Sequence, residues 1–240
     1  MRLSLLALAA LASSAAGAQT FRLTIPLDRP LAVRLDGRAA AELGAVVLTG
    51  VGHLAASRAG VSGAYIPAVV AGWDGYVGYR AATEPGYLAD LGFTGENLGR
   101  AARDVGLIAG GAALGMAAYG AASGHLRLHA GLVPLLVLYP AWGLTQQMLV
   151  QAFVTRHLAD AGLPARAVVP VSAAAFGLVH VPNWPLTAAT TALGGAFAPL
   201  YLRDGNLWPL GVAHGALGAL FYVWVLDRDP LAELAGGGAE

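Results

Sequence analysis

The sequence has the length of a single domain and the composition of a membrane protein. Its 240 residues are 57% hydrophobic and only 12% charged, the mean hydropathy is +0.61 and the formal net charge is zero, which is too apolar for an ordinary soluble domain. All fourteen basic residues are arginines without a basic tail, so no nucleic-acid partner is expected, and the absence of cysteine excludes disulfides and thiolate chemistry.

The N-terminus is typical of a secretory signal peptide. Residues 1–18, MRLSLLALAALASSAAGA, hold one arginine, a short apolar core and a small-residue end that fits a leader-peptidase site. A cleaved bacterial signal peptide is therefore predicted. A polar N-terminal segment (19–38), a transmembrane helical domain (39–226) and a flexible tail (227–240) are expected to follow.

Apolar windows of roughly membrane-spanning length fill the domain. They cover 39–56, 62–80, 105–123, 131–155, 166–182, 185–202 and 207–226. Their length and composition predict an all-α fold, a polytopic transmembrane helical bundle with about seven membrane segments. The expected location is the inner (plasma) membrane of a bacterium as a multi-pass protein, with membrane lipid as a partner.

The arginines conflict with the simplest layout of these segments. If all seven cross after a cleaved signal peptide, ten arginines lie outside, which inverts the usual positive-inside preference. Two alternatives restore it. Either 62–80, interrupted by Pro67, Gly72 and Asp74, enters the membrane and returns, or the leader is retained and 19–38 is cytoplasmic.

The longest polar connection, residues 82–103, allows two interpretations. The spacing of Leu88, Leu91, Leu98 and Ala102 suggests a helix lying in the membrane interface. A solvated loop that returns the chain is the alternative.

Few polar side chains interrupt the last four apolar segments, and these are the candidate site residues, because polar groups inside a bilayer need partners or a water-filled cavity. The set is Gln146, Gln147 and Gln151, then Phe176, His180 and Asn183, and finally His214. Gln147 and Gln151 are four residues apart, which puts them on one helix face. Three helices thus offer an amide pair and two imidazoles that can converge on one buried pocket.

The order of these motifs resembles the CPBP family of CAAX-type and bacteriocin-processing intramembrane endopeptidases. The similarity rests on the polar pair, on F-x-x-x-H in FGLVHVPNW, on the glycine-rich GGAFAPLYLRDGNLWPL and the final histidine, and on LGFTGENLGR upstream, and it covers residues 88–226. In that family the motifs are E-E-x-x-x-R, F-x-x-x-H and H-x-x-x-N. Their glutamates and histidines are held to activate a water that attacks a peptide bond near the membrane surface.

The resemblance also shows where this chain departs from the family. Gln146 and Gln147 stand in the positions of the two glutamates and Gln151 in that of the arginine, while Gly218 replaces the asparagine that follows His214 by four. A neutral amide cannot act as a general base. The joint exchange is nevertheless coherent, because losing the carboxylate alone would leave the arginine as an uncompensated buried charge.

The resemblance implies catalytic roles for the three glutamines, His180 and His214, and substrate contacts for Phe176 and Asn183. If the reaction needs a carboxylate, Asp74 or Glu42 is the candidate, although Glu42 can equally be a helix-end residue near the interface and Asp74 a turn or partner-bonding residue. If it needs none, His180 or His214 can serve as the general base while the glutamines position water or an oxyanion.

Other polar residues are expected to be structural. Ser172 and Thr145 are more typical of helix hydroxyls than of nucleophiles. His125, His129 and His157 are expected at the membrane surface. Two imidazoles with amide oxygens make a poor zinc set, so no metal and no cofactor is expected.

Two functions remain open. One is an intramembrane endopeptidase with a histidine-centred site that cuts a membrane-bound or lipidated protein or peptide substrate. The other is a catalytically inactive pseudoprotease, a membrane scaffold that binds a hydrophobic segment without cutting it.

Overall fold

The computed structural model describes residues 20–25, 31–127 and 132–228, so the expected signal peptide (1–18) and nearly all of the expected tail lie outside the described residues. The chain divides into two compact units. We call residues 1–92 with 148–203 the first unit, and residues 93–147 with 204–240 the second unit.

Helices form nearly all of the described chain. In order, the elements are β1 (Thr20–Ile25), β2 (Leu31–Asp36), α2 (Gly37–Arg58), α3 (Ser62–Thr83), α4 (Tyr87–Asp90), α5 (Leu98–Ser123), α6 (Leu132–Gln147), the π-helix η1 (Met148–Thr155), α7 (Arg156–Asp160), α8 (Ala165–Leu178), α9 (Trp184–Asp204), α10 (Trp208–Leu220) and the π-helix η2 (Phe221–Val225). Every predicted apolar segment coincides with a helix.

Four of these helices are long and apolar enough to cross a membrane. Within the described residues they are Gly37–Arg58, Leu98–Ser123, the continuous helix Leu132–Asp160, and Trp208–Val225. The apolar helix Ala165–Leu178 is shorter, at 14 residues. The chain is therefore a membrane-helical protein with at least four helices of spanning character, whereas the count of seven crossings stays a prediction.

A β-hairpin precedes α2, in the segment 19–38 that was predicted only to be polar. β1 and β2 pair antiparallel, with Thr20 opposite Asp36. Asp36 then ends the hairpin and begins the helix, because its Oδ1 accepts a hydrogen bond of 2.8 Å from the backbone N–H of Ala39. The amide of Arg34 also donates to the carbonyl of Ala161, 3.0 Å away, so the hairpin is attached to the end of α7.

The connection at 82–103 does not form one interface helix. It contains the single turn α4, and α5 begins only at Leu98. Gly92 and Asn97 between them have φ of 99° and 55°, which is left-handed backbone that a continuous helix cannot contain. The prediction of a helix through Leu91 and Leu98 was therefore wrong.

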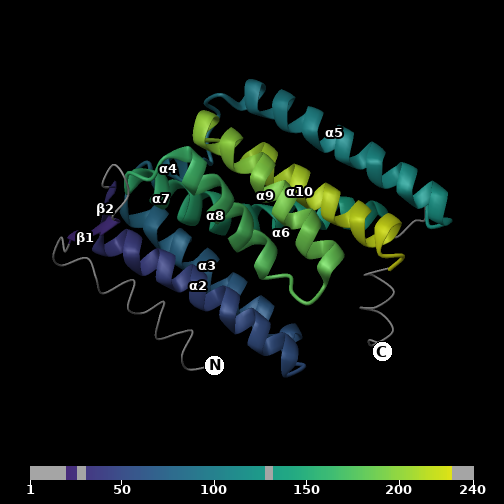
Figure 1. Ribbon diagram of the computed structural model, residues 1–240, viewed down its shortest axis with the longest axis horizontal. Coiled ribbons are helices and arrows are strands. Elements are labelled where there is room, and N and C mark those ends of the chain that lie inside the picture. Colours follow the sequence, from purple (N-terminus) through teal and green to yellow (C-terminus); the bar gives the residue numbers. More distant parts are fainter. Residues whose placement is uncertain (1–19, 26–30, 128–131, 229–240) are drawn as a thin grey trace. The chain divides into compact units, whose positions relative to one another are not determined.

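Within the second unit, α10 packs against both α5 and α6 (Figure 1). Leu132 and Leu135 of α6 form a buried apolar cluster with Ala219 and Val223. This packing fixes the faces of α6 and α10 that carry the candidate site residues of this unit.

Candidate functional site

The first and third motifs meet inside the second unit. Gln147, which is fully buried, places its Nε2 3.3 Å from Nδ1 of His214, which is 8% exposed. An amide nitrogen can only donate, so with the amide in this orientation Nδ1 of His214 accepts and the ring proton lies on Nε2. Gln147 therefore fixes the histidine as an Nε2–H tautomer.

Glycines allow the close helix approach behind this contact. A Cβ added to Gly143 would lie 2.7 Å from the backbone nitrogen of Gly215, and one added to Gly215 would lie 2.5 Å from Cα of Pro140. Real Cβ atoms essentially never show such distances. Small residues at both sides of the α6–α10 contact thus let the backbones touch, and His214 lies directly before Gly215 in this contact.

Replacing Gly215 by alanine is expected to lower the free energy of unfolding by about 1–3 kcal/mol, because the added methyl group overpacks the backbone of α6. Thermal unfolding in detergent micelles measures this effect. Gly218→Ala is the matched control on the same helix, since its Cβ would lie 3.6 Å from the nearest atom of Tyr139, an ordinary contact. Equal stability of the two variants would show that α6 and α10 do not require this close approach.

Gln151 belongs to a buried polar network of the first unit. Its Oε1 accepts a hydrogen bond of 2.9 Å from Oγ1 of Thr155, and Oγ of Ser172 on α8 lies 2.9 Å from the same Oγ1. All three residues are fully buried. Ser172 thus joins two helices through its hydroxyl, while Thr145 lies 3.4 Å from the carbonyl oxygen of Ala141 on its own helix.

His180, just after α8, is held in the opposite tautomer. Its Nδ1 lies 2.8 Å from the carbonyl oxygen of Phe176 and 3.2 Å from Oγ1 of Thr190. A carbonyl oxygen only accepts, so Nδ1 carries the proton and, in the neutral ring, Nε2 keeps a lone pair. The buried ring of Phe176 meets the imidazole edge-on at a centroid distance of 5.5 Å. The F-x-x-x-H motif therefore orients its own histidine.

The remaining two predicted residues have simpler surroundings. Oδ1 of Asn183 accepts a hydrogen bond of 3.1 Å from the N–H of Leu186, which is the pattern of a helix N-cap and begins α9. Gln146 is half-buried beside Gln147. Of the predicted site residues, Gln146, Gln147 and His214 lie in the second unit, and Gln151, Phe176, His180 and Asn183 lie in the first.

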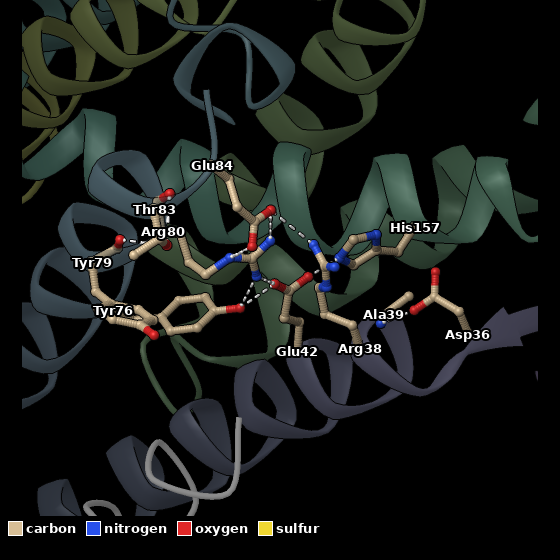
Figure 2. Close-up of polar contacts among 10 residues, drawn as sticks. All are labelled: Asp36, Arg38, Ala39, Glu42, Tyr76, Tyr79, Arg80, Thr83, Glu84 and His157. Atoms are coloured by element: carbon tan, nitrogen blue, oxygen red, sulfur yellow. Dashed lines mark hydrogen bonds and ion pairs between the residues drawn. The ribbon is translucent and has the colours of Figure 1, made fainter. Parts of the chain in front are cut away.

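A second polar centre in the first unit surrounds Glu42 (Figure 2). Glu42 is 2% exposed, and its Oε1 accepts from Tyr76 Oη at 2.5 Å and from Arg80 Nη1 at 3.3 Å. Its Oε2 lies 2.5 Å from Nε2 of His157, which is 8% exposed. His157 is therefore buried within the protein by its contact with this carboxylate, and its expected position at the membrane surface stays a prediction.

The cluster continues to the C-terminal end of α3, where Glu84 follows the helix (Figure 2). Arg80 donates from Nε to Oε1 and from Nη2 to Oε2 of Glu84, both at 2.5 Å, and Arg38 Nη1 lies 3.2 Å from Oε2. The hydrogen bonds from Arg80 lower the pKa of Glu84, and the charge of Arg38 lowers it further. We call Arg38, Glu42, Tyr76, Arg80, Glu84 and His157 the Glu42 cluster.

Each charged side chain of the Glu42 cluster has a partner of opposite charge within it. Both oxygens of Glu42 accept hydrogen bonds within it, so this carboxylate is committed to structure and a role as the missing general base has no geometric support. Asp74, the other acid that the sequence offered, is exposed on α3. Within the cluster, Arg80 and Glu84 form the pair that is local in sequence, four residues apart.

Comparison with known proteins gives one family. The model of a family described as type II CAAX prenyl endopeptidase, Rce1-like, matches residues 127–220. No curated protein and no solved structure matches the chain. The matched stretch contains the Gln147–His214 contact and the Phe176–His180 motif.

Proposed function

We propose that this chain, whose residues 127–220 match the model of the Rce1-like family of type II CAAX prenyl endopeptidases, is an intramembrane endopeptidase with a histidine-centred site. Its substrate is a membrane-bound or lipidated protein or peptide, and its location is a bacterial plasma membrane that it crosses several times. The enzyme class follows the family, and the histidine-centred chemistry is our proposal.

One observation carries the proposal. Gln147 and His214 keep a buried hydrogen bond between the first and third motifs although the first motif has lost its charges. Loss of either partner would leave the other as a buried polar group without this hydrogen bond, at a cost of about 1–3 kcal/mol. The polar contact is consistent with a site that still functions.

The two histidine tautomers support separate chemical roles. His180 has the lone pair on Nε2 and can take a proton from water as the water oxygen attacks the peptide carbonyl carbon; it then gives that proton to the leaving amine. His214, protonated on Nε2 by the contact with Gln147, can donate a hydrogen bond to the developing oxyanion. The family resemblance assigns both motifs to one reaction.

The alternative is a pseudoprotease that binds a hydrophobic segment without cutting it. The observation that favours it is the network of Gln151, Thr155 and Ser172, in which the residue at the family's arginine position is satisfied like a core amide. No carboxylate remains in the first motif. On this alternative the amides preserve packing only.

The double variant Gln147→Glu with Gln151→Arg separates the two functions, because it restores the charges of the family motif at both positions. The proposal expects the parent chain to cleave membrane-anchored peptides, measured as new peptide termini by mass spectrometry in mixed micelles. Gln147→Ala is the control and should cleave more slowly than the parent. Cleavage that arises only in the double variant would establish the parent as a binder on a protease fold.

A further inference from the structure

Two buried hydrogen-bond donors of the first unit lack acceptors. The hydroxyl of Tyr87 and the Nε–H of Arg156 have no hydrogen-bond partner among the described residues. Tyr87 is only 7% exposed. Buried polar groups are nearly always hydrogen-bonded, so such exceptions point to a bound molecule. Because a guanidinium group can only donate, the missing partner of Arg156 is an acceptor.

Both donors are attached to α4, Tyr87 as its first residue and Arg156, on α7, through a hydrogen bond. Tyr87 begins α4, and Nη1 of Arg156 donates to the carbonyl oxygen of Asp90 at its end. Tyr201 holds the turn from another helix, since its hydroxyl donates to the carbonyl oxygen of Leu91 at 3.1 Å. The donors are therefore pre-organised before any ligand binds, which reduces the entropy lost on binding.

The electrostatic surroundings keep these groups as donors. The guanidinium of Arg80 lies 4.5 Å from the ring centroid of Tyr87. Burial, and next the charge of Glu42, raises the pKa of Tyr87 to about 12, so the hydroxyl stays protonated at neutral pH. Asp160 is 71% exposed and its Oδ2 lies 3.9 Å from Nε of Arg156, too far for a hydrogen bond.

We propose that Tyr87 and Arg156 bind a phosphate group. A phosphate offers several acceptor oxygens and the negative charge that a guanidinium prefers. Arg156 lies near the end of the candidate span Leu132–Asp160, the depth at which phospholipid headgroups lie. Leu88, next to Tyr87, is 42% exposed and offers apolar surface beside the phosphate. A phospholipid and a soluble phosphate ester share this chemistry, and the site is independent of peptide-bond cleavage.

Thermal unfolding of the full chain in detergent micelles tests the proposal with three probes. Dioleoylphosphatidylglycerol should raise the unfolding temperature, whereas dioleoylglycerol, which lacks the phosphate, should not. Inorganic phosphate is the third probe. Tyr87→Phe and Arg156→Lys should each weaken the apparent affinity for the phospholipid by at least about tenfold. Tyr79→Phe, at a tyrosine that is 56% exposed, is the matched control and should bind like the parent.

Thermal unfolding measured without lipid tests whether the Tyr87→Phe variant folds. Tyr87→Phe should then unfold at the same temperature as the parent or higher, because it loses a hydroxyl that has no acceptor. A Tyr87-dependent shift with inorganic phosphate supports the phosphate site and assigns a soluble source. Equal shifts with both lipids, an undiminished shift in Tyr87→Phe, or no shift with either phosphate probe would overturn the proposal.

Discussion

Replacing Glu42 by alanine is expected to lower the free energy of unfolding by about 3–5 kcal/mol, the usual effect of removing one partner of a buried ion pair. The loss leaves the guanidinium of Arg80, which is 6% exposed, without one of its carboxylates. It also removes the acceptor of the Tyr76 hydroxyl and of His157. The Glu42 cluster joins α2, α3 and α7, so the packing of three elements depends on this carboxylate.

Denaturant-induced unfolding in detergent micelles measures this difference. Arg38→Ala is the matched control from the same cluster, because Arg38 and Glu84 have side chains that are 53% and 41% exposed, and such surface ion pairs contribute about 0–1 kcal/mol. If Glu42→Ala costs no more than Arg38→Ala, the Glu42 cluster does not stabilise the first unit.

Replacing His180 by alanine is expected to slow peptide cleavage by about 100-fold to 10,000-fold, the contribution of a positioned general base. The hydrogen bond from Nδ1 to the carbonyl of Phe176 orients the ring, and the alanine variant loses the lone pair on Nε2. The purified protein in mixed micelles with a library of membrane-anchored peptides provides the assay, in which new termini are counted by mass spectrometry.

His125 offers a matched histidine control for this loss. It lies outside the family motifs, its side chain is 30% exposed, and its nearest carboxylate oxygen, on Asp227, is 3.9 Å away. His125→Ala should therefore cleave like the parent. An equal loss of cleavage in both variants would indicate a general effect on folding rather than a catalytic role for His180.

Hydropathy predicts the helices of this chain well because a membrane helix must satisfy its backbone internally and presents an apolar surface for its whole length. The structure begins α2 at Gly37 and α10 at Trp208, within two residues of the predicted segments at 39 and 207. The hairpin before α2 was missed because its two six-residue strands are too short to give a hydropathy signal comparable to that of a membrane helix. Left-handed Gly92 and Asn97 likewise interrupt a helical pattern that the leucine spacing suggested.

The sequence predicts the candidate site only in part. A motif identifies residues, but it does not say which residue of a distant segment each one contacts. The spacing of Phe176 and His180 predicts their contact, which is local. The contact of Gln147 with His214 joins residues 67 apart; the polar residues of the apolar helices and the family resemblance both suggested such a convergence, but neither named this pair. The pairing of Glu42 with His157 spans 115 residues, and neither periodicity nor a motif indicates it.

The proposed function requires that the glutamine-containing motif still supports peptide-bond cleavage. The most direct measurement compares the protein termini of three cell lines by mass spectrometry: cells that carry the parent chain, cells that lack it, and cells that carry His180→Ala. If the chain is a protease that uses His180, a set of termini will require the parent chain and disappear with His180→Ala. Termini that are identical in all three lines, or fully restored by His180→Ala, would contradict the proposed function.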